Sequence, residues 1–132
     1  MIRSELESTV YNLLKENGIT TRIFKQDTRD PNYKGEYIEI IPLVFGETSL
    51  LADSIVNVNI HIPDVNGIKN SKRIDTLSDQ VRPIFRQEKD AFNQYYTIYN
   101  GAQFSIVSTV DYAENNATHF RNFRINVIYL NL

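Results

Sequence analysis

The stretch SIVNVNIHIP, near the middle of the chain, alternates between apolar and polar side chains. Because successive side chains of a β-strand point to opposite faces, this period of two predicts a strand with one buried face. Every second residue from Val56 to Ile62 falls on the predicted inner face. The alternate row is polar and consists of Asn57, Asn59 and His61. We expect this row to face water, a ligand or another protein.

Two segments have the apolar spacing of helices instead. Leu6, Val10 and Leu13 recur at intervals that put them on one helical face, and the Asn-Gly pair after them favours a helix end. In the second segment, Ile74, Leu77, Val81, Ile84 and Phe85 follow the same spacing, with Ser71 as the expected cap. Pro83 lies inside this second pattern, so the helix is predicted to kink there or to break near Val81.

The remaining periodic segments predict strands. They are Thr20–Lys25, Tyr37–Val44, Tyr95–Tyr99, Ala102–Tyr112 and His119–Leu130. Asn100-Gly101 is a strong hairpin signal because both residues tolerate positive φ, and Asn115-Asn116 is a second expected turn. The predicted order is α-β-β-β-α-β-β-β, an α+β fold in which a mostly antiparallel sheet packs against two helices. Residues 1–132 form one domain in this prediction.

The apolar sides of these elements define an expected core. Its members are Leu6, Val10, Leu13, Val58, Ile60, Leu77, Val81, Ile125 and Val127. The chain has no cysteine, which excludes disulfides and thiolate metal sites. The first residues lack an apolar signal segment and no stretch is apolar enough to span a membrane, so we expect a soluble protein.

Charge is distributed unevenly along the chain. Residues 1–66 carry 6 basic and 10 acidic groups, whereas residues 67–132 carry 8 and 6. Much of the basic excess is found at Lys69, Lys72, Arg73, Arg82, Arg86 and Lys89. Such a cluster is either a solvated helix face or a surface that docks onto an acidic partner. It lacks interleaved aromatic platforms, and the net charge is −2, so nucleic acid is not the expected partner.

Motifs for catalysis or metal binding are missing from the sequence. His61 and His119 have no second ligand at metal-binding spacing and are expected to be outward-facing strand residues. Asp27 and Asp30 lack the ligand pattern of a calcium loop and are expected to cap turns. We therefore predict no enzyme activity, no metal and no cofactor. A small enzyme that uses Asp27, Asp30 or His61 is the less favoured alternative, and clustering of these three residues would support it.

Tyrosines and exposed leucines suggest binding surfaces. Tyr95, Tyr96 and Tyr99 crowd one short strand, where they either form cross-strand pairs or contribute to a protein interface. Leu50 and Leu51 lie in an expected loop and are exposed there unless something covers them. One alternative function follows, a monomeric adaptor module that binds a partner through the Tyr95–Tyr99 hairpin.

The whole arrangement resembles a family. A capped helix, SELESTVYNLLKENG, is followed by the loop DTRDPNYKG, the strand EYIEIIPLVF, a returning strand, a charged helix and long paired strands. This order is similar to that of the tail-completion or tail-terminator proteins of long-tailed bacteriophages. The resemblance covers nearly the whole chain and lies in element order and length. Pro83 and the apolar SLLADSIV segment have no counterpart that we can place in the family.

The resemblance implies a structural role without catalytic residues. In that family a small α+β subunit forms a ring, usually of six copies, which stops tail-tube polymerisation and joins the tail to the neck. Partners would be other copies of the chain, the tail tube and the neck or connector. The location would be the bacterial cytoplasm during assembly and then the virion. Asn57, Asn59 and His61 would face a neighbouring subunit or the lumen, and the acidic and basic halves could pair around the ring.

Overall fold

The computed structural model describes residues 3–43, 53–114 and 117–129, with the side chains of residues 3, 4 and 53 left out. Its elements are α1 (Arg3–Glu16), β1 (Arg22–Lys25), β2 (Tyr37–Leu43), β3 (Asp53–Pro63), α2 (Ser71–Val81), the 3₁₀ helix η1 (Arg82–Phe85), β4 (Glu88–Lys89), β5 (Tyr95–Tyr99), β6 (Ala102–Glu114) and β7 (Thr118–Tyr129). The predicted α+β class is confirmed. The prediction did not include η1 or the two-residue strand β4.

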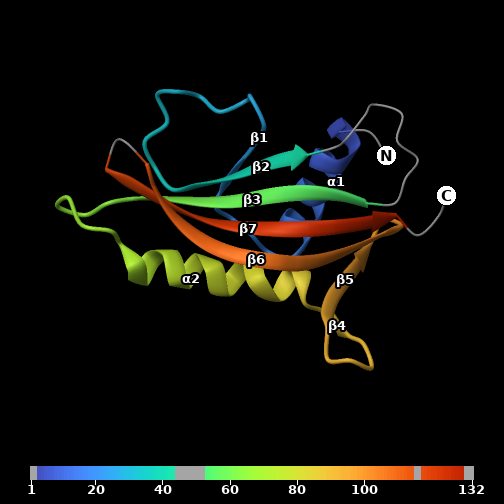
Figure 1. Ribbon diagram of the computed structural model, residues 1–132. Helices are drawn as coiled ribbons and strands as arrows, with labels where there is room; N and C mark the ends of the chain where they lie inside the picture. Colours follow the sequence, from blue (N-terminus) through green and yellow to red (C-terminus); the bar gives the residue numbers. More distant parts are fainter. Residues whose placement is uncertain (1–2, 44–52, 115–116, 130–132) are drawn as a thin grey trace.

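A seven-stranded sheet in the order β1-β2-β3-β7-β6-β5-β4 forms the centre of the structure (Figure 1). All neighbouring pairs are antiparallel except β1 and β2, which are parallel. The long strands β3 and β7 pair along Asp53–Pro63 and Thr118–Tyr129 and are the middle of the sheet. The sheet is therefore mostly antiparallel, as the hairpin-length connections predict.

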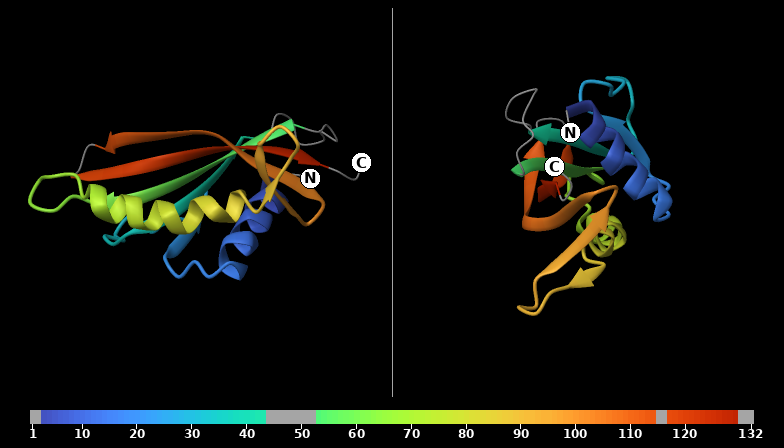
Figure 2. Two further views of the ribbon diagram at one scale, coloured as in Figure 1. Left: turned by 90° about the horizontal axis from the view of Figure 1, so that it is seen from below. Right: turned by 90° about the vertical axis from the view of Figure 1, so that its right-hand side faces the viewer.

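Both helices lie on the same side of this sheet (Figure 2). Helix α1 contacts β1 and β2, and α2 contacts β3 and β7. Every residue of the expected core is buried between the helices and the sheet, namely Leu6, Val10, Leu13, Val58, Ile60, Leu77, Val81, Ile125 and Val127. Helices α1 and α2 therefore both cover one face of the sheet, and neither of them covers its other face.

Helix α1 ends through backbone geometry that its sequence dictates. Gly18 has φ +89°, a conformation in which a side chain would be strained. The Ile19 N–H then donates to the Leu14 carbonyl at 3.2 Å, and Ile19 is buried against the core. This closing turn satisfies a carbonyl of the last helical turn and directs the chain into β1.

Helix α2 differs from its prediction at the start and agrees with it at the end. The cap is Asn70 rather than Ser71, because the Asn70 side chain accepts the Arg73 N–H at 3.2 Å. The helix ends at Val81, and Pro83 lies within the first turn of η1. Proline is tolerated at the start of a helix, where its missing N–H leaves no bond unmade. The expected break at Val81 is therefore confirmed.

Turn chemistry and proline set the limits of the strands. Asn100 and Gly101 have φ 51° and 75°, as the predicted hairpin turn requires. Pro42 pairs with Val56 of β3 at a point where β1 has already ended, so β2 is an edge strand there. The predicted turn Asn115-Asn116 lies outside the described residues.

Candidate interaction surface

Among the described residues, no helix covers the second face of the sheet, which we call the open face (Figure 2). The strand registers give its members in four strands. They are Tyr37, Glu39 and Ile41 of β2; Asn57, Asn59 and His61 of β3; Phe120, Asn122 and Arg124 of β7; and Ser108, Val110 and Tyr112 of β6. The polar row of the alternating stretch therefore lies on this face, opposite the hydrophobic core.

Four rings form a continuous row across the open face. Tyr112, Phe120, His61 and Tyr37 come from β6, β7, β3 and β2 and are direct partners in the register. Their ring centroids are 5.1, 4.9 and 4.3 Å apart in that order, and each neighbouring pair is stacked. Stacking between cross-strand partners stabilises a sheet on a face that has no helix.

His61 lies on the face opposite the core, as expected of an outward-facing strand residue, but it is buried within this row, with 5% of its surface exposed. The rings of Tyr37 and Phe120 cover its two sides. Its Nδ1 lies 2.5 Å from Glu114 Oε1, and its Nε2 lies 3.6 Å from Glu39 Oε1. Neighbours from three strands thus remove His61 from water, which period-two alternation by itself does not reveal.

A group of amides lies beside the aromatic row. Asn122 Nδ2 donates to Asn59 Oδ1 at 2.7 Å and to Asn57 Oδ1 at 3.1 Å. Asn59 is buried and Asn57 is half-buried. Because a buried amide costs free energy unless it is hydrogen-bonded, these bonds account for the polar side chains at this place.

Tyr37 ends the row next to the loop between β1 and β2. The Arg29 guanidinium lies 5.3 Å from the centre of its ring. Burial raises the pKa of Tyr37 to about 12, and the positive charge of Arg29 opposes this effect. Burial therefore outweighs the nearby cation, and Tyr37 remains a neutral phenol under ordinary conditions.

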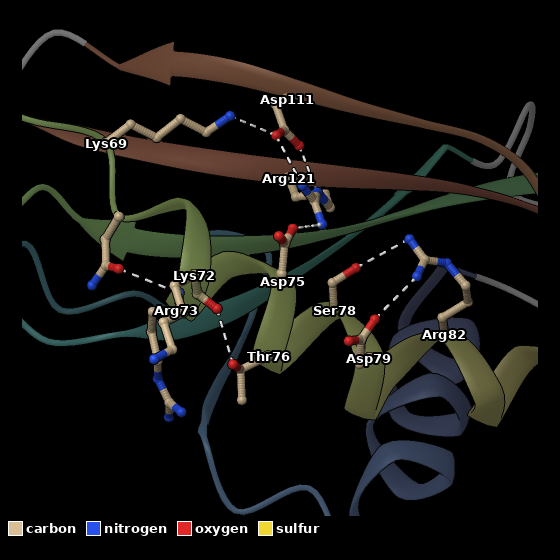
Figure 3. A network of polar contacts seen from close by, with 11 residues as sticks. Lys69, Lys72, Arg73, Asp75, Thr76, Ser78, Asp79, Arg82, Asp111 and Arg121 are labelled. Carbon is tan, nitrogen blue, oxygen red and sulfur yellow. Dashed lines mark hydrogen bonds and ion pairs between the residues drawn. The ribbon is translucent and has the colours of Figure 1, made fainter.

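Much of the predicted basic cluster is paired within the fold (Figure 3). Lys69 Nζ lies 2.7 Å from Asp111, and Arg121 binds the same carboxylate through Nε at 2.6 Å. Arg121 also reaches Asp75 of α2 at 2.9 Å. The hydrogen bonds from Arg121 hold the pKa of Asp111 at about 2, against the opposing effect of burial, and Lys69 adds to them. These pairs connect α2 to β6 and β7.

The two residues of the basic cluster that lie on α2, Lys72 and Arg73, have different surroundings. Arg73 forms a two-pronged pair with Glu36, at 2.5 Å through Nε and 2.9 Å through Nη2. Lys72 is exposed, and its carbonyl accepts from the Thr76 hydroxyl (Figure 3). The cluster is thus partly a set of internal ion pairs and partly a solvated helix face.

The tyrosines of β5 lie beside a cleft of about 570 Å³ between η1, the β4–β5 arm and β6. Tyr95 and Tyr96 line it together with Arg82 and Arg86, and the Arg86 guanidinium lies 4.0 Å from the Tyr95 ring centre. Tyr99 packs against the core instead. The structure therefore brings Tyr95 and Tyr96 together with part of the basic cluster but separates Tyr99 from them.

In the described part of the chain, the residues of the alternative enzyme line neither the 570 Å³ cleft nor a second cavity. Asp30 caps its own turn, because its Oδ1 accepts the Asn32 N–H at 2.9 Å. A second cavity of about 780 Å³ lies between the β1–β2 loop and the β6–β7 hairpin, and neither Asp27, Asp30 nor His61 lines it. Nor do the described residues include a group of three potential ligands that could hold a metal ion.

Leu50 and Leu51, the remaining predicted interface residues, lie outside the described residues. The aromatic row is the main feature that sequence reasoning missed. Its members come from four strands, and the register shows that they are neighbours. The described helices include none that is long and apolar enough to cross a membrane. No protein-family model matches this sequence, and no curated protein is similar to it at a significant level.

Proposed function

We propose that this chain is a structural subunit of a bacteriophage or prophage tail. In this proposal its copies form a ring, of six subunits in the family that it resembles, at the head-proximal end of the tail. The ring stops growth of the tail tube and joins the tail to the neck. The subunit assembles in the bacterial cytoplasm and then belongs to the virion.

The one-sided sheet is the observation that carries the proposal. Both helices bury the same face, while the open face presents Tyr112 and Val110 with 48% and 42% of their surfaces exposed. A sheet that keeps apolar side chains exposed on its second face is suited to contact with another protein. The α+β class and the order of the long elements are also those expected from the resemblance.

The role needs no catalytic centre. Some polar groups on the open face bind one another, as in the contact of Asn122 with Asn57 and Asn59. His61 is similarly occupied by Glu114. These contacts stiffen the sheet, and a stiff sheet loses little entropy when it joins an assembly.

Tail tubes provide the test. Purified chain is added to tubes assembled from the tube protein that is encoded nearest to it, and tube ends are viewed by negative-stain electron microscopy. We expect a ring at one end of each tube and no further growth from that end. Unrestricted growth with bare ends, at concentrations where the chain is folded, would exclude the proposal. Neighbouring reading frames for portal, tape-measure or major tail proteins would support it independently.

A second candidate, the adaptor module, is favoured by the β4–β5 arm. Phe92 at its tip is 82% exposed and Ile98 is 53% exposed. The exposed Phe92 and the contact between Arg86 and Tyr95 supply aromatic and basic side chains of the kind enriched in protein interfaces. If this arm binds a foreign partner, Phe92→Ala should abolish that binding. The adaptor would act as a monomer, whereas tube capping is carried out by a ring.

A further inference from the structure

The outer edge of β6 is a long stretch of unpaired strand. β5 pairs with β6 only through Ala102–Phe104, after which the two strands separate. From Ser105 to Glu114, β6 bonds to β7 on one side, and no described backbone hydrogen bond reaches its other side. Such an edge can accept another strand unless proline, lysine or a bulge prevents it. Ser105–Glu114 contains neither proline nor lysine, and its bulge, near Val107, lies at the beginning of the stretch.

The opposite end of the sheet has a second open edge. Among the described strands, β1 pairs with β2 alone. Apart from the bonds between β1 and β2, one described backbone hydrogen bond involves β1. It is a turn bond in which the Thr28 N–H donates to the Lys25 carbonyl at 3.1 Å. These two edges on opposite sides of the subunit provide two different patches, as a head-to-tail contact needs, because there one patch meets a different patch on the next copy.

Strand direction allows these two edges to pair. β1 is parallel to β2, and the steps from β2 to β3, β7 and β6 are each antiparallel. β1 and β6 therefore run in opposite directions. When a second copy continues the sheet with the same face outward, its β1 comes to lie antiparallel to β6.

One register satisfies charge and face at the same time. With Arg22 opposite Glu114, Lys25 falls opposite Asp111, so each basic residue meets an acidic one. Arg22 and Phe24 share the open face with their β2 partners Tyr37 and Glu39, and Glu114 and Tyr112 lie on that face of β6. Lys25 and Asp111 both lie on the helix-covered face.

We propose that β1 of one copy adds to the Asp111–Glu114 segment of β6 in the next copy, in this register, and so continues the sheet from subunit to subunit. This pairing specifies how neighbouring subunits of the ring contact each other, and it rests on the self-assembly proposed above. Tyr112, half-exposed in the single chain, then lies opposite Phe24 of the neighbour. The aromatic row continues across the junction, because Phe24 already contacts Tyr37 edge-to-face at 5.6 Å.

Disulfide cross-linking tests this register directly, because the chain has no cysteine of its own. The variant Arg22→Cys/Glu114→Cys places two thiols at directly opposed positions, about 4.5–5.5 Å apart between Cα atoms. After oxidation at high protein concentration, a non-reducing gel should show a ladder that extends beyond dimers, since every copy offers both thiols. The matched control is Arg22→Cys/Thr109→Cys, which moves the second thiol five residues along β6 and to the other face.

The outcomes separate the pairing from the proposed function. An equally strong ladder from the control, or cross-links that stop at dimers, would overturn the register. An oligomeric sample without any ladder would overturn the strand pairing and leave the ring intact. A sample that is monomeric by light scattering and does not cap tail tubes would overturn both.

A charge reversal provides a second measurement that is independent of the thiols. Arg22 is exposed, so Arg22→Glu should fold normally and weaken self-association by at least about tenfold, through repulsion from Glu114. Lys34→Glu makes the same reversal of charge at an exposed loop position and should leave association nearly unchanged. Equal effects of the two variants would contradict the pairing.

Discussion

The two faces of the sheet bury their side chains by different means. On the helix-covered face, Val58, Ile60 and Ile125 are completely buried under α1 and α2. On the open face, Asn59 and His61 reach almost the same burial through ring stacking and hydrogen bonds between neighbouring strands. These three side chains of the first face are buried within a single chain. The second still exposes apolar side chains, and another protein can cover them.

Truncation of a helix-covered residue should have the largest effect. Ile125→Ala or Leu13→Ala should lower the free energy of unfolding by about 2–5 kcal/mol, because a buried side chain is lost and a cavity remains. The matched change on the open face, Val110→Ala, should cost less than about 0.5 kcal/mol, since Val110 is 42% exposed. Urea denaturation of the free chain measures both. Equal losses would show that the two faces do not differ in this way.

His61→Ala should come next, with a loss of roughly 2–3 kcal/mol from two stacking contacts and the bond to Glu114. His61→Phe keeps a ring between Tyr37 and Phe120 and should recover part of that loss. If the alanine variant is as stable as the original chain, stacking in the aromatic row contributes nothing to the stability of the fold.

The ion pairs between α2 and the sheet should appear as a pH effect. The pKa of Asp111 is lowered to about 2 in the folded chain, so its contribution is complete above its ordinary value of 3.8 and is lost as the pH falls through about 2. We expect a loss of roughly 1–2 kcal/mol over that range, reduced from the full value by solvent screening. Asp111→Asn should remove this part of the acid dependence, and an unchanged acid titration in the variant would contradict it.

The β4–β5 arm should contribute least to stability. Tyr95 is partly exposed and contacts Arg86 outside the core, so Tyr95→Ala should change the free energy of unfolding by at most about 0.5 kcal/mol. Thr97→Ala in the same strand should cost more, because the buried Thr97 hydroxyl donates to the Ile84 carbonyl at 2.6 Å. Thermal unfolding of the two variants distinguishes a binding arm from a structural one.

Local sequence signals predicted the features that depend on nearby residues. The alternation from Val56 to Ile62, the Asn100-Gly101 turn and the break before Pro83 each follow from the conformational limits of the residues themselves. The choice of Asn70 over Ser71 as a cap is a shift of one residue between two side chains of similar capping ability.

Features that depend on register could not be predicted in the same way. The burial of His61 requires Tyr37 and Phe120 to be its direct neighbours, and the three residues come from separate strands. The parallel pairing of β1 with β2 also follows from the path of the intervening loop rather than from either strand. The candidate surface was thus located by alternation, while its chemistry depends on contacts between distant segments.

Light scattering over a wide concentration range, at low and at high salt, is the most direct test of whether a chain with this open face self-assembles. We predict growth toward one discrete oligomer as concentration rises, and a weaker tendency at high salt because the charges at the contact are screened. A free subunit that is monomeric when dilute is compatible with this result, since each contact can be weak. A strict monomer at millimolar concentration, in low salt, that also fails to cap purified tail tubes would contradict the account.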